Sequence, residues 1–520
     1  MKRRLAALLC VLALAPLARA QDAEKPAVPE EAKPADAEPA AAAEPAVPVE
    51  TKEQALERMT GEALKNIEAI RGLKMKGPVE RRWTTRDQMK EDMLKQMEEE
   101  LPPEKMAAFS RALAFLGLVK EGTDLKETFS EAMAGAVAGY YLPDEKVFFL
   151  VEGFAEDGSR PIVFHELTHA VEDQYYDYFD QMEKWGKQDQ TDRLMAVKAV
   201  VEGSAQLYTE RFMDSEPGLE DRFFTAMVKE QTSDGGKALK AQMETPAFFA
   251  IVMGMYPYHN GSRFLRAVQS RLPAVKEGED PMARFHDDPP ASSEMILHPE
   301  KYLGVRDLPQ EVRLPALAEV LGEGWKEEYQ DTMGELLTGV VLNAWFAPNN
   351  AMAQMMSVAL LPEGGMKKPA DALKIGVSYK GKVGAATAGW DGDRQAVYGS
   401  GDAVCMAWAS VWDSPEDAAE FAGTYGTVLG KKYRVELPPE KEGDAPKKGP
   451  APSEDFEKDG WTGRLWRTTR EGFSSFVVSS GNRVLVAERI PADRLDAVVG
   501  ALAKTEFVQD EKDALPVPAK

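Results

Sequence analysis

Five consecutive residues, His165-Glu166-Leu167-Thr168-His169, combine side-chain types and a spacing that could do chemistry. Residues four apart lie on one face of a helix, so the two imidazoles can converge on one metal ion. Glu166 is offset by one position, which places a carboxylate beside that ion and near a bound water. The chain contains only five histidines, so chance rarely produces this pattern. We predict that His165 and His169 bind a metal and that Glu166 is catalytic.

A catalytic zinc site needs three protein ligands and one position left open for water. The segment Val200-Val201-Glu202-Gly203 offers Glu202 as the third ligand, 33 residues after His169. That separation is compatible with a helix, a turn and a returning helix. Gly203 and Ala205 are small, which would let the returning helix approach the metal helix closely. A glutamate on a solvated helix face is the alternative reading of Glu202.

A β-hairpin is predicted just before the motif. Residues 136–142 and 147–151 are rich in aromatic and β-branched side chains, and a Pro-Asp turn separates them. An edge strand beside a metal site can hold an extended peptide by backbone hydrogen bonds. The hairpin therefore adds a possible substrate-binding element to the predicted metal site.

An oxyanion formed at a zinc site needs a second donor, usually His, Tyr or Arg. We predict His298 for this role, while His259, Tyr256 and Tyr302 are alternatives that the sequence does not rank. The remaining histidine, His286, precedes two aspartates and is expected at the surface.

The segment His165–Val171 resembles the metal helix of the gluzincin, or thermolysin-like, metallopeptidases, and Glu202 matches that family's third-ligand glutamate. The thermolysin pattern has an aspartate four residues after this glutamate, where this chain has Gln206. Over roughly residues 135–305 the chain also resembles uncharacterised bacterial secreted proteins with an HExxH motif. That likeness lies in Gly139-Tyr140-Tyr141, Asp173-Gln174, Glu202-Gly203-Ser204-Ala205 and the block from Pro289-Pro290 to Tyr302.

The resemblance implies an exported Zn²⁺-dependent peptidase with a protein or peptide substrate. Two neutral imidazoles and one carboxylate leave the ion with a net positive charge, which lowers the pKa of its water to around 7. Glu166 would accept that proton and pass it to the leaving amine. Two alternatives stay open. One is a zinc-stabilised peptide-binding or scaffold protein that hydrolyses nothing, and the other is a helical surface protein without metal.

The predicted fold class is α+β, with a zincin-like, mostly helical core, a preceding hairpin and a separate C-terminal α+β domain. Apolar residues at three-to-four spacing predict helices at 54–73, 88–101 and 106–118. Whether these helices belong to the core or form a pro-segment is left open. The predicted organisation is a signal peptide (1–20), an Ala/Pro/Glu-rich linker (21–50), an N-terminal helical region (51–134), a zincin-like catalytic domain (135–362) and a C-terminal α+β domain (376–510).

Residues 1–20 have the organisation of a signal peptide, with a basic start, an apolar stretch from Leu5 to Leu17 and an Ala18-Arg19-Ala20 cleavage site. The apolar stretch is shorter than the ~20 residues that span a membrane. We therefore expect export to the periplasm or the medium, without stable membrane insertion. Removing the four positive charges of this segment changes the formal net charge from −23 to −27. Such acidity argues against nucleic acid as a partner; the oligomeric state is not indicated.

Three further features are expected to be structural. Cys405 lies in a predicted strand and should be buried and unreactive. Asp391-Gly392-Asp393 has too few carboxylates for a calcium loop and is expected to form a turn. The methionines between Met352 and Met356 are expected to pack in the core.

Overall fold

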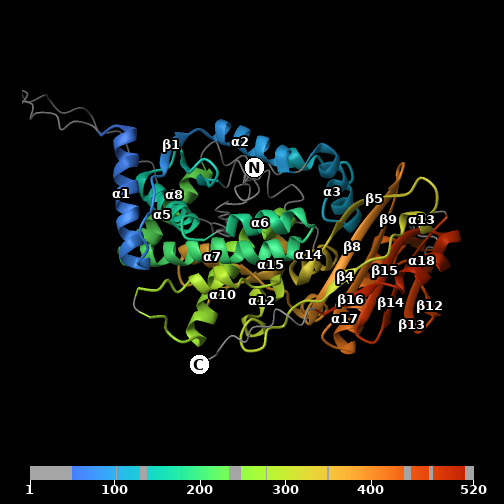
Figure 1. Cartoon of the computed structure of the whole chain (residues 1–520). Helices are drawn as coiled ribbons and strands as arrows, with labels where there is room; N and C mark the ends of the chain where they lie inside the picture. Colours follow the sequence, from blue (N-terminus) through green and yellow to red (C-terminus); the bar gives the residue numbers. More distant parts are fainter. Residues whose placement is uncertain are drawn as a thin grey trace, which may run out of the picture.

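The computed structural model describes residues 50–100, 102–128, 137–176, 178–232, 248–276, 278–347, 351–362, 364–437, 447–467 and 472–509. Figure 1 shows helices gathered on one side of the molecule and a large sheet on the other. The mixed α+β class predicted from the sequence is confirmed at this level. The predicted signal peptide and nearly all of the linker lie outside the described residues.

Three long helices form the centre of the helical half: α5 (Glu156–Asp173), α7 (Thr191–Ser215) and α10 (Phe248–Arg271). In Figure 1, α7 runs across the middle of this half with α10 below it. A Cβ atom on Gly203 would lie 2.4 Å from the backbone carbonyl carbon of Gly261, so this crossing requires glycine. We predicted that Gly203 would allow close approach of the metal helix. This prediction was wrong, because the Cα of Gly203 packs against α10 instead.

The predicted N-terminal helices are confirmed as α1 (Lys52–Arg71), α2 (Arg86–Glu100) and α3 (Pro103–Leu116). Apolar side chains of α1, such as Leu56 and Ile67, are buried in one cluster with Val163 of α5 and Val200 of α7. The other helices of this half are α6 (Tyr178–Lys187), α8 (Leu219–Thr232), α11 (Ala283–Asp287), α12 (Ser293–Leu297), α14 (Gly334–Phe346) and α15 (Ala351–Val358).

The predicted hairpin is confirmed as the antiparallel strands β2 (Gly139–Leu142) and β3 (Val147–Val151). A third strand, β1 (Glu80–Thr84), pairs in parallel with β3 and was not predicted, because residues 51–134 showed only helical spacing. The strand order is β1-β3-β2, so β2 is an edge strand. It packs against α5, the helix that carries the motif.

The large sheet is antiparallel throughout, in the order β12-β13-β14-β15-β9-β8-β5. Alternating residues of β9 face opposite sides, with Trp408 packed under α17 (Pro415–Lys432) and Cys405 in the cluster that includes α18 (Leu495–Leu502). The strands are β5 (Lys326–Asp331), β8 (Trp390–Ser400), β9 (Ala403–Trp412), β12 (Glu454–Lys458), β13 (Trp461–Arg467), β14 (Phe473–Ser480) and β15 (Arg483–Pro491).

The sheet differs from the sequence prediction at two places. Strand β5 lies within the range 135–362 that was predicted as the catalytic domain, so the sheet does not begin after residue 376. Asp391-Gly392-Asp393 lies in β8 at an irregularity of the pairing with β9. The prediction of a turn there was wrong, because Gly392 (φ +150°) lets the strand continue past the backbone of Gln310.

The smaller elements connect these two parts. They are the strand pairs β4 (Glu311–Arg313) with β16 (Glu506–Val508), β6 (Ala359–Leu360) with β7 (Gly376–Val377), and β10 (Val435–Leu437) with β11 (Lys447–Gly449), and the short helices η2 (Pro299–Lys301), α13 (Ala318–Leu321), η3 (Pro369–Lys374), α16 (Gly381–Ala385) and η4 (Ala492–Arg494).

Cys405 is a buried free thiol, as predicted. Met355 is buried, but Met356 is 54% exposed, so the methionine run in α15 does not lie wholly in the core. Among the described residues, no helix combines the length and the apolar character needed to cross a membrane.

Candidate metal centre

The structure brings together His165 and His169 from α5 and Glu202 from α7. Their side chains approach one another through three atoms, the two Nε2 atoms and Oε2 of Glu202. The Nε2 atoms lie 3.2 Å apart, and Oε2 lies 3.4 Å from His165 and 3.3 Å from His169. All three side chains are buried.

These distances fit a tetrahedral ion. A zinc ion with bonds of about 2.0–2.1 Å holds neighbouring ligand atoms about 3.3 Å apart. The three distances between ligand atoms observed here, 3.2 to 3.4 Å, match that spacing. Two imidazoles and one carboxylate are also a donor set that zinc accepts, with a fourth position left for water or substrate.

Without an ion, the buried carboxylate of Glu202 needs another positive charge to compensate it. Burial acts to raise the pKa of Glu202, but the two imidazoles outweigh it and the pKa falls below its ordinary value. Burial opposes charge on His169, yet the Glu202 carboxylate raises its pKa to about 9. Burial lowers the pKa of His165. A proton on His169 therefore compensates the buried carboxylate where a divalent cation would otherwise do so.

Thr209 orients the first ligand and was missed by the sequence prediction. Its hydroxyl donates to the Ala205 carbonyl at 2.8 Å, and its Oγ1 lies 3.4 Å from Nδ1 of His165. Because the hydroxyl proton is used, Oγ1 can only accept from Nδ1–H, which leaves the Nε2 lone pair facing the cluster. Gln206, at the position of the expected aspartate, instead donates to Glu210 at 3.0 Å.

Glu166 lies beside the cluster, with 1% of its surface exposed. The backbone N–H of Tyr141 in β2 donates to its carboxylate. Burial raises the pKa of Glu166 to about 8, and its Oε2 atom is buried with no hydrogen-bond partner. A Cβ atom on Gly139 would meet Ile162 at 2.8 Å and Glu166 at 3.5 Å, so a glycine here allows β2 to approach the motif.

A buried network supports the second ligand. Glu172, three residues after His169, accepts a hydrogen bond from Ser204 at 2.6 Å and forms an ion pair with Arg71. Arg71 is the last residue of α1, and its guanidinium also pairs with Asp280 at 2.9 Å. The first helix therefore contributes a buried charge close to the metal centre.

The predicted oxyanion donors do not gather at the cluster. His298 lies against Glu335 of α14, with 3.1 Å between Nε2 and Oε1. The Tyr256 hydroxyl donates to Ser293, and the Tyr302 hydroxyl donates to Asp288. A tyrosine that we did not predict, Tyr258 of α10, has its ring centroid 5.7 Å from that of His165.

The two remaining histidines are both buried. His286 is 5% exposed and stacks on Tyr176 with ring centroids 4.0 Å apart, so the prediction of a surface position was wrong. The two aspartates that follow His286 suggested a solvated turn, but the imidazole itself points into the protein. His259 lines a cavity on α10 together with Arg263, away from the three predicted ligands.

A second group of three carboxylates also has ligand atoms within 4.8 Å of one another: Glu294, Asp307 and Asp413. The ammonium of Lys301 lies among them, 2.6 Å from Glu294 and 2.7 Å from each aspartate. A lysine already provides the cation in this cluster.

The matching family model covers the sheet rather than the metal centre. Residues 320–499 match the family described as Domain of unknown function (DUF8575), a range that contains β8, β9 and α17 but none of the three predicted ligands. No curated protein matches the chain. The chain is similar to a solved structure, a candidate hydrolase with a novel fold from Chloroflexus aurantiacus, at 18% identity and a TM-score of 0.32. That similarity covers 50% of this chain and 91% of the other, and at this TM-score no shared fold or activity follows.

Proposed function

We propose that the protein is an exported zinc-dependent peptidase of gluzincin type, with a zincin-like core. One observation carries the proposal: the ligand atoms of His165, His169 and Glu202 have the spacing of three corners of a zinc tetrahedron. Glu166 next to them supplies the carboxylate that peptide hydrolysis requires. Export by residues 1–20 is part of the same proposal.

His165, His169 and Glu202 would hold the ion, and Thr209 would keep the first imidazole in the binding tautomer. When bound, Zn²⁺ would polarise the scissile carbonyl and make water acidic enough to react at neutral pH. In its ionised form, Glu166 would accept a proton from the attacking water as the new C–O bond forms. It then delivers that proton to the amine nitrogen as the C–N bond breaks.

Strand β2 would position the base. The backbone N–H of Tyr141 donates to Glu166, which fixes the carboxylate against α5. Because this N–H is already used, an extended substrate would have to pair with other groups of the edge strand.

The decisive experiment compares two glutamate variants in a quenched-peptide assay, together with metal analysis. Glu202→Gln should lose bound zinc and activity, since it removes a charged ligand. Glu166→Gln should keep one equivalent of zinc and lose roughly 10²–10⁴-fold in kcat, the usual contribution of a general base. Glu210→Gln, a buried glutamate two turns further along α7, is the matched control and should keep its zinc.

Full activity in Glu166→Gln would rule out the proposed mechanism. One equivalent of tightly bound zinc in Glu202→Gln would rule out the proposed ligand set.

The burial of the site favours a second candidate function, a zinc-stabilised scaffold without turnover. His165 and His169 are 0% exposed, and Glu166 and Glu202 are 1% exposed. A structural zinc site has a closed coordination sphere, whereas hydrolysis requires access for substrate. Zinc that raises the unfolding temperature while a broad peptide library stays uncleaved would favour the scaffold.

A further inference from the structure

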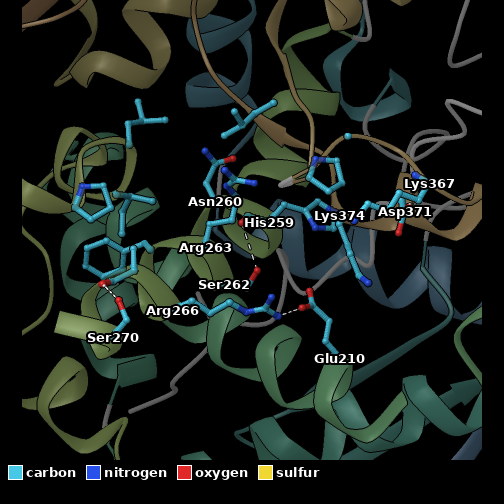
Figure 2. A pocket seen from close by; sticks show the side chains of 18 residues that line it. Glu210, His259, Asn260, Ser262, Arg263, Arg266, Ser270, Lys367, Asp371 and Lys374 are labelled. Carbon is cyan, nitrogen blue, oxygen red and sulfur yellow. Dashed lines mark hydrogen bonds and ion pairs between the residues drawn. The ribbon is translucent and has the colours of Figure 1, made fainter. Parts of the chain in front are cut away.

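A cavity of about 650 Å³ lies along α10, and neither Tyr258 nor any of the three predicted metal ligands lines it. One wall is formed by α10 residues spaced three to four apart, including His259, Arg263 and Arg266. The other wall is the segment from Leu360 to Lys374. Figure 2 shows the basic side chains of α10 toward the left and Lys367 with Asp371 toward the right.

The acids that line this cavity already have partners. Glu210 forms an ion pair with Arg266 and accepts a hydrogen bond from Gln206. Asp371 accepts the backbone N–H groups of Lys367 at 2.7 Å and Lys368 at 2.9 Å. The charge of Glu210 is therefore balanced by Arg266, whereas Asp371 is hydrogen-bonded to neutral groups and keeps its negative charge.

Among the residues that the structure describes, two cations of the lining lack an acidic partner. Arg263 donates only one long hydrogen bond, from Nη1 to the Leu361 carbonyl at 3.4 Å. The ammonium of Lys367 has no ion pair with any residue that the structure describes. In a chain of formal net charge −23, two uncompensated cations facing one cavity are an unusual arrangement. Among its described residues, the lining contains four basic side chains (Arg263, Arg266, Lys367 and Lys374) and two acids (Glu210 and Asp371), so it is net basic.

His259 adds a buried polar group without a partner. The residue is 6% exposed, it lines the cavity, and its Nδ1 atom has no hydrogen-bond partner. Burial and the nearby Arg263 lower the pKa of this histidine to about 4, so its imidazole is neutral at pH 7. A buried polar atom without a partner destabilises the protein unless a ligand or a water satisfies it.

We propose that this cavity is a binding site for a small anion bearing carboxylate or phosphate groups, separate from the metal centre. The guanidinium of Arg263 presents the planar set of donors that such groups accept, and Lys367 provides a second positive charge across the cavity. The volume exceeds that of an inorganic ion and suits an organic anion.

Isothermal titration of the full chain with citrate and with inorganic phosphate tests the proposal, because these probes separate carboxylate from phosphate recognition. Arg263→Gln and Lys367→Gln should each weaken binding at least fivefold. His259→Gln should weaken it without a change in charge. The matched control is Arg271→Gln, which removes an exposed arginine at the end of the same helix and outside the cavity.

Saturable binding of either probe that weakens in Arg263→Gln but not in Arg271→Gln supports the proposal, and the probe that binds identifies the chemical group. Absence of saturable binding for both probes overturns it. Equal losses in the two arginine variants also overturn it, since they would indicate general attraction to the protein surface. Glu202→Gln should bind the probe unchanged, so failure of the metal centre and failure of this site are distinguishable.

Discussion

The metal centre and the Lys301 cluster compensate clustered negative charge in different ways. Each contains three side chains whose ligand atoms lie within 4.8 Å of one another. In the Lys301 cluster the cation is covalently part of the chain and contacts all three carboxylates. In the metal centre the only carboxylate, Glu202, faces two imidazoles that are neutral unless they take up a proton.

The Lys301 cluster therefore has a fixed cation, whereas the cation at the metal centre can exchange. A lysine ammonium cannot leave, so the Lys301 cluster has a fixed charge and joins η2 to Asp413, ahead of α17. The imidazole nitrogens of the metal centre have lone pairs, so a proton and a divalent cation can replace each other there. A set of acids within bonding distance therefore indicates a metal site only when no lysine lies among them.

Asp192, near the start of α7, shows a third way to compensate negative charge. It is 2% exposed, and its Oδ2 atom is buried without a hydrogen-bond partner. Burial raises its pKa to about 7, so a proton on the carboxyl itself replaces a cation. The three regions together allow four tests, which follow in order of decreasing expected effect.

Replacing the lysine tests whether its charge is structural. Lys301→Met should lower the free energy of unfolding by about 3–5 kcal/mol, since it leaves the buried Glu294 without its cation beside two partly exposed aspartates. Added calcium should restore part of this loss in the variant but not in the wild type. Lys458→Met, which removes an ion pair to the exposed Asp496, should cost about 1 kcal/mol or less. Urea unfolding measures both, and equal losses would contradict the comparison.

The proton on Asp192 predicts a specific pH dependence. Between about pH 4 and pH 7 the folded state keeps this proton and the unfolded state loses it, so stability must fall as the pH rises. Asp192→Asn should remove this component, which is about 2–4 kcal/mol across that window. Unfolding free energies at pH 4.5 and 7.5 provide the measurement. Parallel profiles for the wild type and the variant would refute the assignment.

The crossing of α7 and α10 offers a test of the scaffold that holds Glu202. Gly203→Ala should destabilise the protein by about 1–3 kcal/mol, because the new methyl group meets backbone atoms of Gly261. Gly61→Ala in α1 is the control, since a Cβ atom there meets nothing within 4 Å. That substitution should stabilise the protein by about 0.5–1 kcal/mol. Thermal unfolding that ranks the two variants in the opposite order would contradict the packing described.

The smallest expected effect concerns the orientation of His165. Thr209→Val removes the acceptor for Nδ1–H and should weaken zinc binding about tenfold. Thr209→Ser keeps the hydroxyl and should bind zinc nearly as well as the wild type. Competition with a coloured chelator measures both affinities. Equal zinc affinities for Thr209→Val and the wild type would mean that this hydroxyl does not select the tautomer.

Local spacing explains which parts of the site were predictable. His165 and His169 are one helical turn apart, and an apolar approach marked Glu202 as facing inward, so the sequence alone indicated that these three meet. Thr209 was also within reach of the sequence, because it lies two helical turns beyond Glu202 on the same face of α7. Arg71 gave no such signal, since its partner Glu172 lies 101 residues away.

Contacts between residues far apart in the sequence also limited the prediction of the fold. Strand β9 is a run of mostly apolar residues, so a strand around Cys405 could be predicted from its own sequence. The strands β1 and β5 carry mostly charged and polar residues at the edges of their sheets, so their β structure depends on a distant partner strand rather than on their own pattern. His286 was misplaced for a related reason, because Tyr176 buries it from outside its own segment.

The guanidinium of Arg71 has a consequence for maturation of the protein. A proteolytic cut that released α1 would break the buried ion pair between Arg71 and Glu172, three positions from His169. The first helix is therefore part of the buried packing around the candidate metal centre, and its removal should destabilise that packing.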